Sequence, residues 1–468
     1  PMALTAHTLE ILFYSTLAFF VLAECFLTAL HSHKADAKAG EIPEDFTGRT
    51  SEAAQRRAAN YTGEVAQAEL LLVFAGALFA WLMTYGQGLT VLAAASTAIL
   101  GPGQAAQWLT LALLLLLALI VEFPLGWYMR QRVKKSYGVK RSVAKRALLR
   151  GIRETVAGYL AALPLIALSL TVFDFAGDYW WLLLWVAWLL YLFWRRQLGI
   201  VYGLFRHRRI RAVRDKSFRA MVRDFLASEG FTMTDLVVTN RPRLWKHSHV
   251  VLAGWGKRRR VVIFSHAMQV LTPTEILALI AHDVGHIRHR HTLLRTTILA
   301  LWGLALAAFA GWGSTHGVFF EGFGVSRHVT FHTGAANAGW VLAVAIATFP
   351  IIFYPFTPLR NLLARALQYD ADLYGARLVG AGPMIRALVK LHRDYSSSLW
   401  PSHLYSLFHY SRPHVTMRVA RLRKYLKDSG QDPEQPVVYS NFDRRKYAAA
   451  SIGDQHRGEI SPQSPSTR

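Results

Sequence analysis

Two histidines near the middle of the chain have the spacing of a metal-ligand pair. His282 and His286 enclose three residues in the run His282-Asp-Val-Gly-His286. Residues four apart lie on one face of a helix, so both imidazoles can reach the same ion. Zinc suits such a pair because imidazole nitrogen is among its preferred ligands. Asp283 adds a carboxylate at the position where zinc peptidases with this pattern carry the glutamate that takes a proton from water.

The same spacing also arises without any metal. The chain has 19 histidines, and His289 and His291 follow the pair closely, so a solvated basic helix face is the plain alternative. The residues before the pair favour metal binding, because Thr272-Pro-Thr-Glu275 has the form of a capping box with proline at the first helical position. An apolar run then leads to His282. We therefore predict a capped, largely apolar helix that carries a zinc site.

A small domain of helices and strands is predicted around this helix. Residues 215–229 place apolar side chains at helical spacing. The runs 235–239, 250–254 and 260–264 are rich in valine and isoleucine and are separated by turn residues, which indicates three short strands. We therefore predict an α+β domain at this point in the chain.

Most of the remaining sequence is predicted to span a membrane. Seven stretches are apolar over the roughly 17 to 25 residues that a helix needs to cross a bilayer. They lie at 8–30, 68–86, 107–128, 155–175, 179–196, 297–314 and 338–357. The predicted fold class is therefore a mainly α, polytopic membrane protein with seven transmembrane helices and a cytoplasmic, zincin-like α+β domain.

The distribution of charge predicts the orientation. The chain has 53 Lys and Arg against 29 Asp and Glu, a formal net charge of +24. Loop 129–154 carries ten basic residues and one acid, whereas loop 87–106 carries no charge. Because short basic loops stay in the cytoplasm, we expect the N-terminus outside and the C-terminus in the cytoplasm. Compact loops and the absence of a targeting signal favour a bacterial inner membrane.

The same charge predicts the partners. Basic residues gather beside the spans, where anionic membrane lipids account for them, so we expect no nucleic-acid partner. The single Cys25 excludes a disulfide within the chain. The polar segment 428–468 is predicted to be a disordered tail, or an arm that docks on protein partners in a membrane complex.

Several segments resemble the type I CAAX prenyl proteases of peptidase family M48. The run from Leu271 to His291 is similar to that family's metal-binding helix, whose core reads His-Glu-Leu-Gly-His followed by a further His. Further similar segments are 58–62, which resembles the family's cytoplasmic loop after the first span, 257–262, 366–372 and 404–418. The resemblance implies seven helices around a water-filled membrane chamber that is closed by the zinc domain. It also implies cleavage of peptides near an isoprenylated cysteine, or of membrane proteins in quality control.

We accordingly divide the chain into five parts. They are five spans with basic loops at 1–200, the α+β domain at 201–296, two spans at 297–357, a second metal segment with the C-terminal motif at 358–427, and the tail at 428–468.

The resemblance also identifies metal ligands, and here the chain departs from the family. The family's third zinc ligand is the first Glu of a Glu-x-x-x-Asp segment, and Gln368 stands at that position. An amide oxygen is a poorer zinc ligand than a carboxylate. Asp372 matches the Asp that holds a ligand histidine, and it shares a helical face with Gln368. Asp370 points about 200° around the helix from Gln368, so we do not expect it to substitute.

Two positions that hold the oxyanion in the family are also replaced. The family's edge-strand Asn corresponds to His249, and a His of its C-terminal motif corresponds to Arg412. Both replacements can donate hydrogen bonds. Two hypotheses follow. In one, the chain is a zinc endopeptidase with Asp283 as base. In the other, it is a pseudoprotease, a binding or structural subunit of a membrane assembly.

Overall fold

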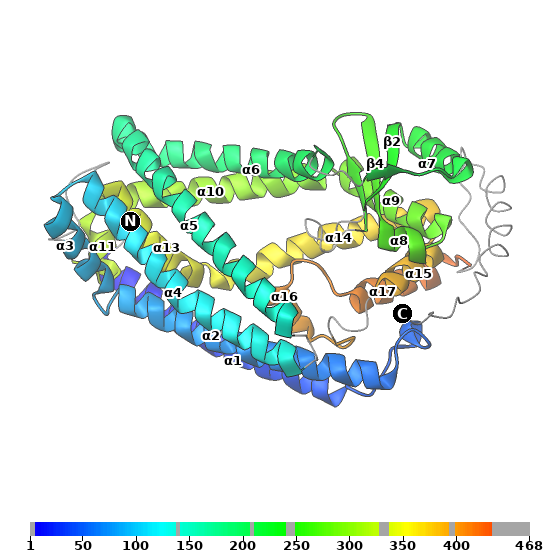
Figure 1. Ribbon diagram of the computed structural model, residues 1–468, viewed down its shortest axis with the longest axis horizontal. Coiled ribbons are helices and arrows are strands. Elements are labelled where there is room, and N and C mark those ends of the chain that lie inside the picture. Colours follow the sequence, from blue (N-terminus) through cyan, green and yellow to red (C-terminus); the bar gives the residue numbers. More distant parts are fainter. Residues whose placement is uncertain are drawn as a thin grey trace, which may run out of the picture.

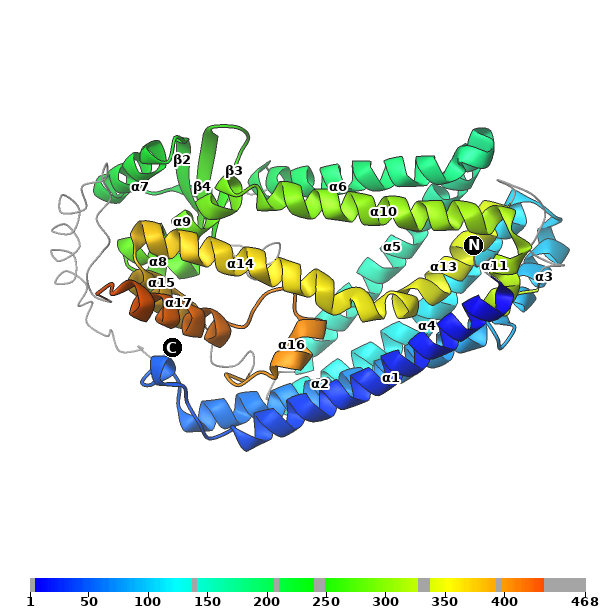
Figure 2. The same cartoon turned by 180° about the vertical axis from the view of Figure 1, so that it is seen from behind.

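The small sheet lies at one end of the protein, and long helices extend from the other end towards it (Figure 1). The computed structural model describes residues 5–136, 141–205, 210–239, 249–326, 337–392 and 398–432. The helices α1, α2 and α4 run side by side along one edge, and α6 and α10 along the other (Figures 1 and 2). The predicted class, a mainly helical membrane protein with a small sheet domain, is confirmed. The bounds are α1 Ala6–Ala37, α2 Glu52–Met83, α3 Gly88–Leu100, α4 Gln104–Ser136, α5 Arg141–Ala176, α6 Trp180–Phe205, α10 His291–Thr315, α11 Gly317–Gly322, α13 Ala338–Ile352 and α14 Thr357–Val379.

The described residues contain five helical stretches that are long and apolar enough to cross a membrane. A sixth is obtained if α13 and the helix beyond it, which bend by 48°, form one broken span. One of the five, Leu148–Arg195, contains both the fourth and the fifth predicted spans, with η2 (Gly177–Tyr179) between them. The count of seven spans therefore stays a prediction, whereas the presence of membrane-spanning helices is confirmed.

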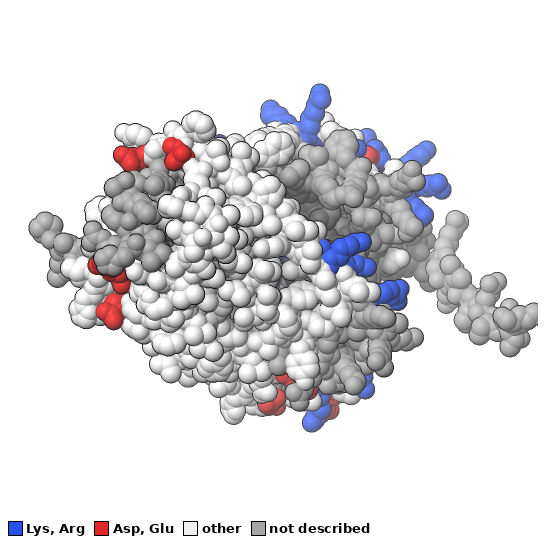
Figure 3. Space-filling view, turned by 60° about the vertical axis from the view of Figure 1, so that its left-hand side comes forward, with Lys and Arg blue, Asp and Glu red and all other residues white. Residues whose placement is uncertain are grey.

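Side chains on the outside of these helices suit a lipid environment. Leu22, Val91 and Leu165 are large, apolar and more than 60% exposed. Figure 3 shows a broad face of uncharged residues, with Lys, Arg, Asp and Glu gathered around its margins. An apolar surface of this extent is stable against acyl chains rather than water. The protein is therefore integral to a membrane.

Two segments that were expected to be loops are helical. Residues 58–62 lie inside α2, which begins at Glu52 because the side chain of Ser51 caps it by accepting from the Ala54 N–H. The uncharged loop 87–106 contains α3, a helix of 13 residues between Gln87 and Gly101. An apolar sequence of that length forms a helix but is too short to span a bilayer.

The sheet has the strand order β1-β2-β4-β3. Its strands are β1 Ile210–Ala212, β2 Thr232–Thr239, β3 Val250–Ala253 and β4 Arg258–Phe264. β2 and β4 are parallel, and β3 runs antiparallel to β4 at the edge of the described sheet. The three predicted strands are present. The strand β1 was not predicted, because three residues are too few to show a strand pattern in the sequence. It forms by antiparallel pairing with β2.

The helices of the sheet domain follow the predicted patterns. α7 (Lys216–Ser228) is capped by Asp215, whose side chain accepts from the N–H groups of Ser217 and Phe218. α9 (Pro273–Arg288) starts with the predicted capping box of Thr272 and Glu275. Shorter elements are η1 Glu44–Phe46, α8 Ser265–Val270, η4 Tyr354–Phe356, α15 Ala381–Leu391, α16 His403–His409 and α17 Val415–Ser429.

One hydrophobic core joins the predicted α+β domain to the later segment 358–427. Val222 of α7 and Ile280 of α9 share it with Met384 of α15 and Leu422 of α17, all at most 1% exposed. Phe46, from the loop between α1 and α2, packs into the same core. These parts therefore fold together. α17 continues to Ser429, just past the predicted start of the tail, and 433–468 lies outside the described residues.

Candidate metal centre

Two glycines allow α9 and α14 to pack closely at the predicted metal site. A Cβ added at Gly285 of α9 would lie 2.9 Å from Cβ of Tyr374. One added at Gly375 of α14 would lie 2.6 Å from Cε of Met384 and 3.1 Å from the backbone N of His282. These distances leave no room for a side chain at either position. The close approach brings residues of α14 beside the histidines of α9, although more than 80 residues separate Gln368 from His282.

His282 is held in place from behind. It is 7% exposed, and its Nδ1 lies 2.9 Å from Oδ1 of Asp372. Asp372 is itself fixed by Arg418 of α17, whose Nε and Nη2 donate to Oδ2 and Oδ1 at 2.7 and 2.5 Å. A carboxylate on one ring nitrogen fixes the orientation of a ligand histidine and leaves the other nitrogen for the metal. Asp372 thus lies where the family resemblance places it, next to a ligand histidine.

Arg418 is a residue for which the sequence indicated no role. It closes the C-terminal motif 404–418, but nothing in the local pattern connects it with Asp372, 46 residues earlier. A buried acid alone would be costly, and a two-pronged guanidinium contact compensates it. The charge of Asp372 is therefore balanced by a residue of α17, a helix that begins within the motif and packs against α14.

Gln368, the predicted third ligand, lies next to His282. Its Nε2 lies 3.0 Å from Nε2 of His282, the ring nitrogen that Asp372 leaves available. Rotation of the side-chain amide by about 180° exchanges its oxygen and nitrogen, and Oε1 then takes the position of Nε2. The amide therefore meets the histidine at the point where the family's carboxylate would join it.

His286 also directs one nitrogen away from the site. Its ring centroid lies 4.8 Å from that of His282, and its Nδ1 lies 2.9 Å from Nδ1 of His291. Nε2 is thus the ligand atom that remains. Burial, and then the neighbouring His282 and His291, lower the pKa of His286 to about 3. The ring is therefore neutral at physiological pH, which is the form that binds a metal.

Asp283 lies between the metal pair and the edge of the sheet. Its Oδ2 accepts from the N–H of Leu252 in β3 at 3.2 Å. Burial raises the pKa of Asp283 to about 6, although His282, the Leu252 N–H and the charge of Arg412 each act to lower it. A carboxyl with a pKa near neutrality is suited to accept and return a proton.

Arg412 lies near Asp283, and His249 directly precedes the strand that contacts Asp283. Arg412 lies in the turn between α16 and α17 and is close enough to Asp283 to affect its pKa. His249 comes directly before β3 and is half-buried, and its carbonyl accepts from the Phe264 N–H at 3.0 Å. The fold therefore assembles β3, α9, α14 and the turn before α17 around one point.

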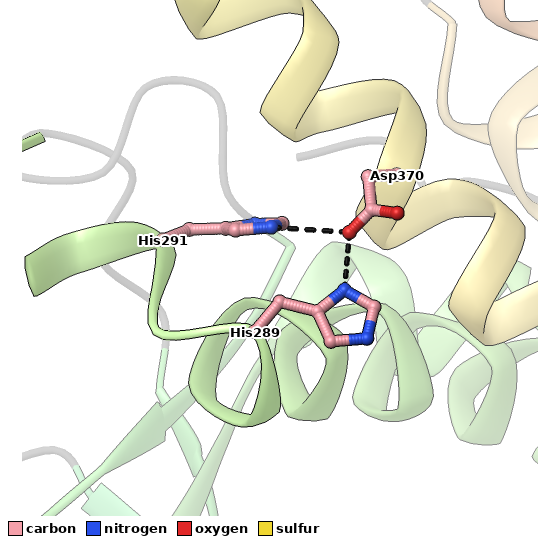
Figure 4. Close-up of side chains that lie close together, drawn as sticks. All are labelled: His289, His291 and Asp370. Carbon is pink, nitrogen blue, oxygen red and sulfur yellow. Dashed lines mark hydrogen bonds and ion pairs between the residues drawn. The ribbon is translucent and has the colours of Figure 1, made fainter. Parts of the chain in front are cut away.

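Asp370 faces a different direction, as predicted. It forms an ion pair with Nδ1 of His289, and its Oδ2 lies 3.1 Å from Nε2 of His291 (Figure 4). From the sequence, a solvated basic helix face was one interpretation of His289 and His291. Their contact with α14 depends on tertiary packing.

The donor set fits zinc. The His282 and His286 rings lie 4.8 Å apart, the Gln368 amide contacts Nε2 of His282, and the Asp283 carboxylate on the same helix could accept a proton. Three protein ligands with an open fourth position are typical of catalytic zinc, although an amide is a weaker ligand than a carboxylate. The residues present can therefore hold the ion, with less affinity than a set of two histidines and a glutamate.

Sequence models of two families match the chain. Residues 32–194 match the N-terminal part of CAAX prenyl proteases, described as five membrane helices, and residues 214–426 match peptidase family M48. The two matches together include most of the membrane helices and the whole candidate site.

Curated relatives and a solved structure agree with these matches. CAAX prenyl protease 1 of Saccharomyces cerevisiae is 24% identical over 67% of this chain and 71% of its own length. The homologue in Arabidopsis thaliana is 28% identical over 44% of this chain, and less than half of that protein, 47%, is covered. An uncharacterized metalloprotease, YhfN of Bacillus subtilis, is 21% identical over 66% of this chain and 71% of its own length.

The crystal structure of Ste24p from S. mikatae superimposes with a TM-score of 0.69 and covers 90% of this chain and 100% of that one, at 18% identity. At that identity the likeness shows a shared fold. The two sequence-model matches show the family: this protein belongs to peptidase family M48.

Proposed function

We propose that the chain is a membrane-embedded zinc endopeptidase with an altered active centre, which cuts peptides or membrane proteins. The observation that carries the proposal is the continuous series of contacts from Arg418 through Asp372 and His282 to Gln368. A buried ion pair behind a histidine is costly to maintain. Its retention is accounted for if that histidine has to be aimed at a metal ion.

Each residue then has one task. His282 and His286 would hold zinc, and the amide of Gln368 would complete the set. When bound, zinc supplies Lewis-acid chemistry that polarises a carbonyl and acidifies water. The carboxylate of Asp283 would accept a proton and return it to the leaving amine. Arg412 and His249 donate hydrogen bonds to the oxygen that gains negative charge.

The edge of the sheet supplies the binding surface for the substrate. Among the described strands, β3 pairs with β4 alone, and it lies next to α9. An extended peptide can add to such an edge as a further strand, and its backbone then lies across the metal site. The peptide class follows from this geometry, whereas nothing in the described residues selects an isoprenyl group.

A second function, that of a pseudoprotease, is favoured by one contact. Oδ2 of Asp283 accepts from the Leu252 N–H, so the carboxylate occupies an edge-strand donor that a substrate carbonyl would use. Together with the neutral Gln368, this contact suits a protein that binds peptides in a membrane complex without cutting them. The two functions differ in rate, not in fold.

Cleavage by the purified full chain separates the two. Zinc-loaded protein is incubated with casein and with a prenylated peptide. An endopeptidase cleaves at least one of them, loses cleavage in His286→Ala, and keeps it in His7→Ala, a change at an exposed histidine far from the site. A chain that is inert, and that becomes active only when Asp283→Glu and Gln368→Glu are combined, is a pseudoprotease.

We also propose the predicted orientation, with the basic loop 129–154 and the sheet domain in the cytoplasm of a bacterium. The chain has one cysteine, so a Cys25→Ser background permits single-cysteine labelling with a membrane-impermeant reagent. Cysteines placed in loop 87–106 should react from outside intact cells, and one placed at Lys427 should react only after lysis. The reverse pattern would invert the orientation.

A further inference from the structure

A second cluster of ligand groups lies beside the metal centre, and it is not part of the proposed function. Nδ1 of His289, Nε2 of His291 and a carboxylate oxygen of Asp370 lie within 4.8 Å of one another (Figure 4). We propose that these three residues form a second metal site, which takes zinc or a divalent ion of similar preference. Two imidazoles and one carboxylate, with a fourth position open to water, form a ligand set that zinc accepts.

The backbone between α9 and α10 is shaped to make this cluster. Arg290, which joins the two helices, has φ 52° and ψ 31°, in the left-handed region. A non-glycine residue rarely adopts that conformation, and where it does, the surrounding structure must compensate the strain. The turn places His289 and His291, on either side of Arg290, against the same carboxylate of α14.

The distances are close to those of a tetrahedral site. Zinc binds nitrogen and oxygen at about 2.0–2.2 Å, so its ligand atoms lie about 3.3 Å apart. Nε2 of His291 and Oδ2 of Asp370 are already 3.1 Å apart. His289 is closer to Asp370 and must move back slightly to admit an ion. The side chains of His289 and Asp370 are 39% and 44% exposed, so they are free to adjust, whereas that of His291, at 6%, is fixed.

The two metal sites are linked by one hydrogen bond. Nδ1 of His286 lies 2.9 Å from Nδ1 of His291, so one of these nitrogens donates and the other accepts. If His286 binds a metal through Nε2, its Nδ1 carries the hydrogen, and the neutral His291 then carries its own hydrogen on Nε2. That nitrogen cannot bind a second ion. Binding at His291 imposes the opposite arrangement, so the two sites compete and the chain holds one ion at a time.

Competition between the two sites means that the second site affects how much metal the first one holds. Gln368 weakens the first site by replacing a charged ligand with a neutral one, whereas Asp370 supplies a charged ligand to the second. The ion is therefore drawn about one helical turn along α9, away from Asp283. The second site does not depend on cleavage, because it rests on ligand geometry alone.

The test is the zinc content of the purified full chain after equilibration with zinc alone and removal of free ion. Wild type, His282→Ala and His289→Ala should each retain about one zinc, since one site survives in each. The double variant His282→Ala/His289→Ala should retain about a tenth of that or less. In the His282→Ala background, Asp370→Asn should also release the ion, and His7→Ala should not, because the exposed pair of His7 and Glu10 offers only two groups.

A zinc-free His282→Ala protein that elutes and melts like wild type would overturn the proposal, since the cluster would then be hydrogen-bonded without metal. If His282→Ala does not fold, Gln368→Ala is compared with Gln368→Ala/His289→Ala: zinc should be retained in the single variant and lost in the double one, because Gln368→Ala weakens the first site and leaves the second intact. Zinc content, not cleavage, is the readout. The zinc content of His282→Ala, which reports the second site alone, is therefore unchanged if the peptidase proposal fails.

Discussion

The side-chain amide of Gln368 lies beside the imidazole of His282, with 3.0 Å between their Nε2 atoms. This neutral contact stands where the M48 resemblance places a metal-binding carboxylate. The site is otherwise complete, since Asp372 and Arg418 hold His282, and His291 holds His286. The chemistry of the chain therefore depends on how well an amide can serve as the third ligand.

Gln368→Glu should tighten zinc binding at the first site. Changing a residue that only contacts a ligand alters metal affinity by about 10–100-fold, so improving the ligand itself should have at least a tenfold effect. Affinity is measured by chelator competition in the His289→Ala background, where only this site binds. Gln269→Glu, on the exposed surface of α8, is the matched control and should have no effect. An unchanged affinity in Gln368→Glu would place that side chain outside the ligand set.

Asp372→Asn should destabilise the fold as well as the site. Asp372 and Arg418 form a buried ion pair, with side chains 3% and 17% exposed. Removing one charge leaves the other buried without a counter-charge. Such a change costs about 3–5 kcal/mol. Asp45 and Arg423 form a more exposed pair, so Asp45→Asn should cost about 1 kcal/mol or less. Unfolding in detergent by a chemical denaturant compares the two, and equal costs would contradict the role given to the buried pair.

Gly375→Ala should loosen the contact between α9 and α14. The added methyl group would clash with Met384 and with the backbone at Ala278 and His282, at a cost of about 1–3 kcal/mol. Gly76→Ala in α2 is the control, because no atom lies within 4 Å of its added Cβ. That change should be neutral or stabilising by at most about 1 kcal/mol. The melting temperatures and zinc contents of the two variants should diverge; matching values would mean that the close packing is not required.

His414→Gln should make the free energy of unfolding less dependent on pH in the acidic range. Burial, and then the nearby His392 and His31, lower the pKa of His414 to about 3 in the folded chain, from 6.5. The stability that comes from its neutral form is therefore complete above pH 6.5 and is lost as the pH falls from there towards 3. Removing the group should reduce the slope by up to about 1.4 kcal/mol per pH unit below neutrality. Denaturant unfolding at pH 6.5, 6.0, 5.5 and 5.0 (about half-unit steps) measures the slope, and a wild-type slope would contradict the assignment.

The sequence by itself determined what depends on neighbouring residues. Each of these features is a pattern within one helix or strand: the His282 and His286 spacing, the Thr272 and Glu275 capping box, the three strands and the apolar spans. Such patterns follow from the backbone geometry of helices and strands, so a single sequence is enough to predict them. The family resemblance extended the prediction to Gln368 and Asp372, and the direction of Asp370 followed from the helical period of α14.

Only the tertiary structure decided which distant side chains meet. Arg418 reaches Asp372 because α17 packs against α14, and Asp370 reaches His289 and His291 because Arg290 turns the chain between α9 and α10. Two glycines set how closely α9 and α14 approach. Contacts of this kind depend on how whole helices pack, and packing is a property of many side chains together. No local period encodes it, which is why the second cluster of ligands emerges only from the folded chain.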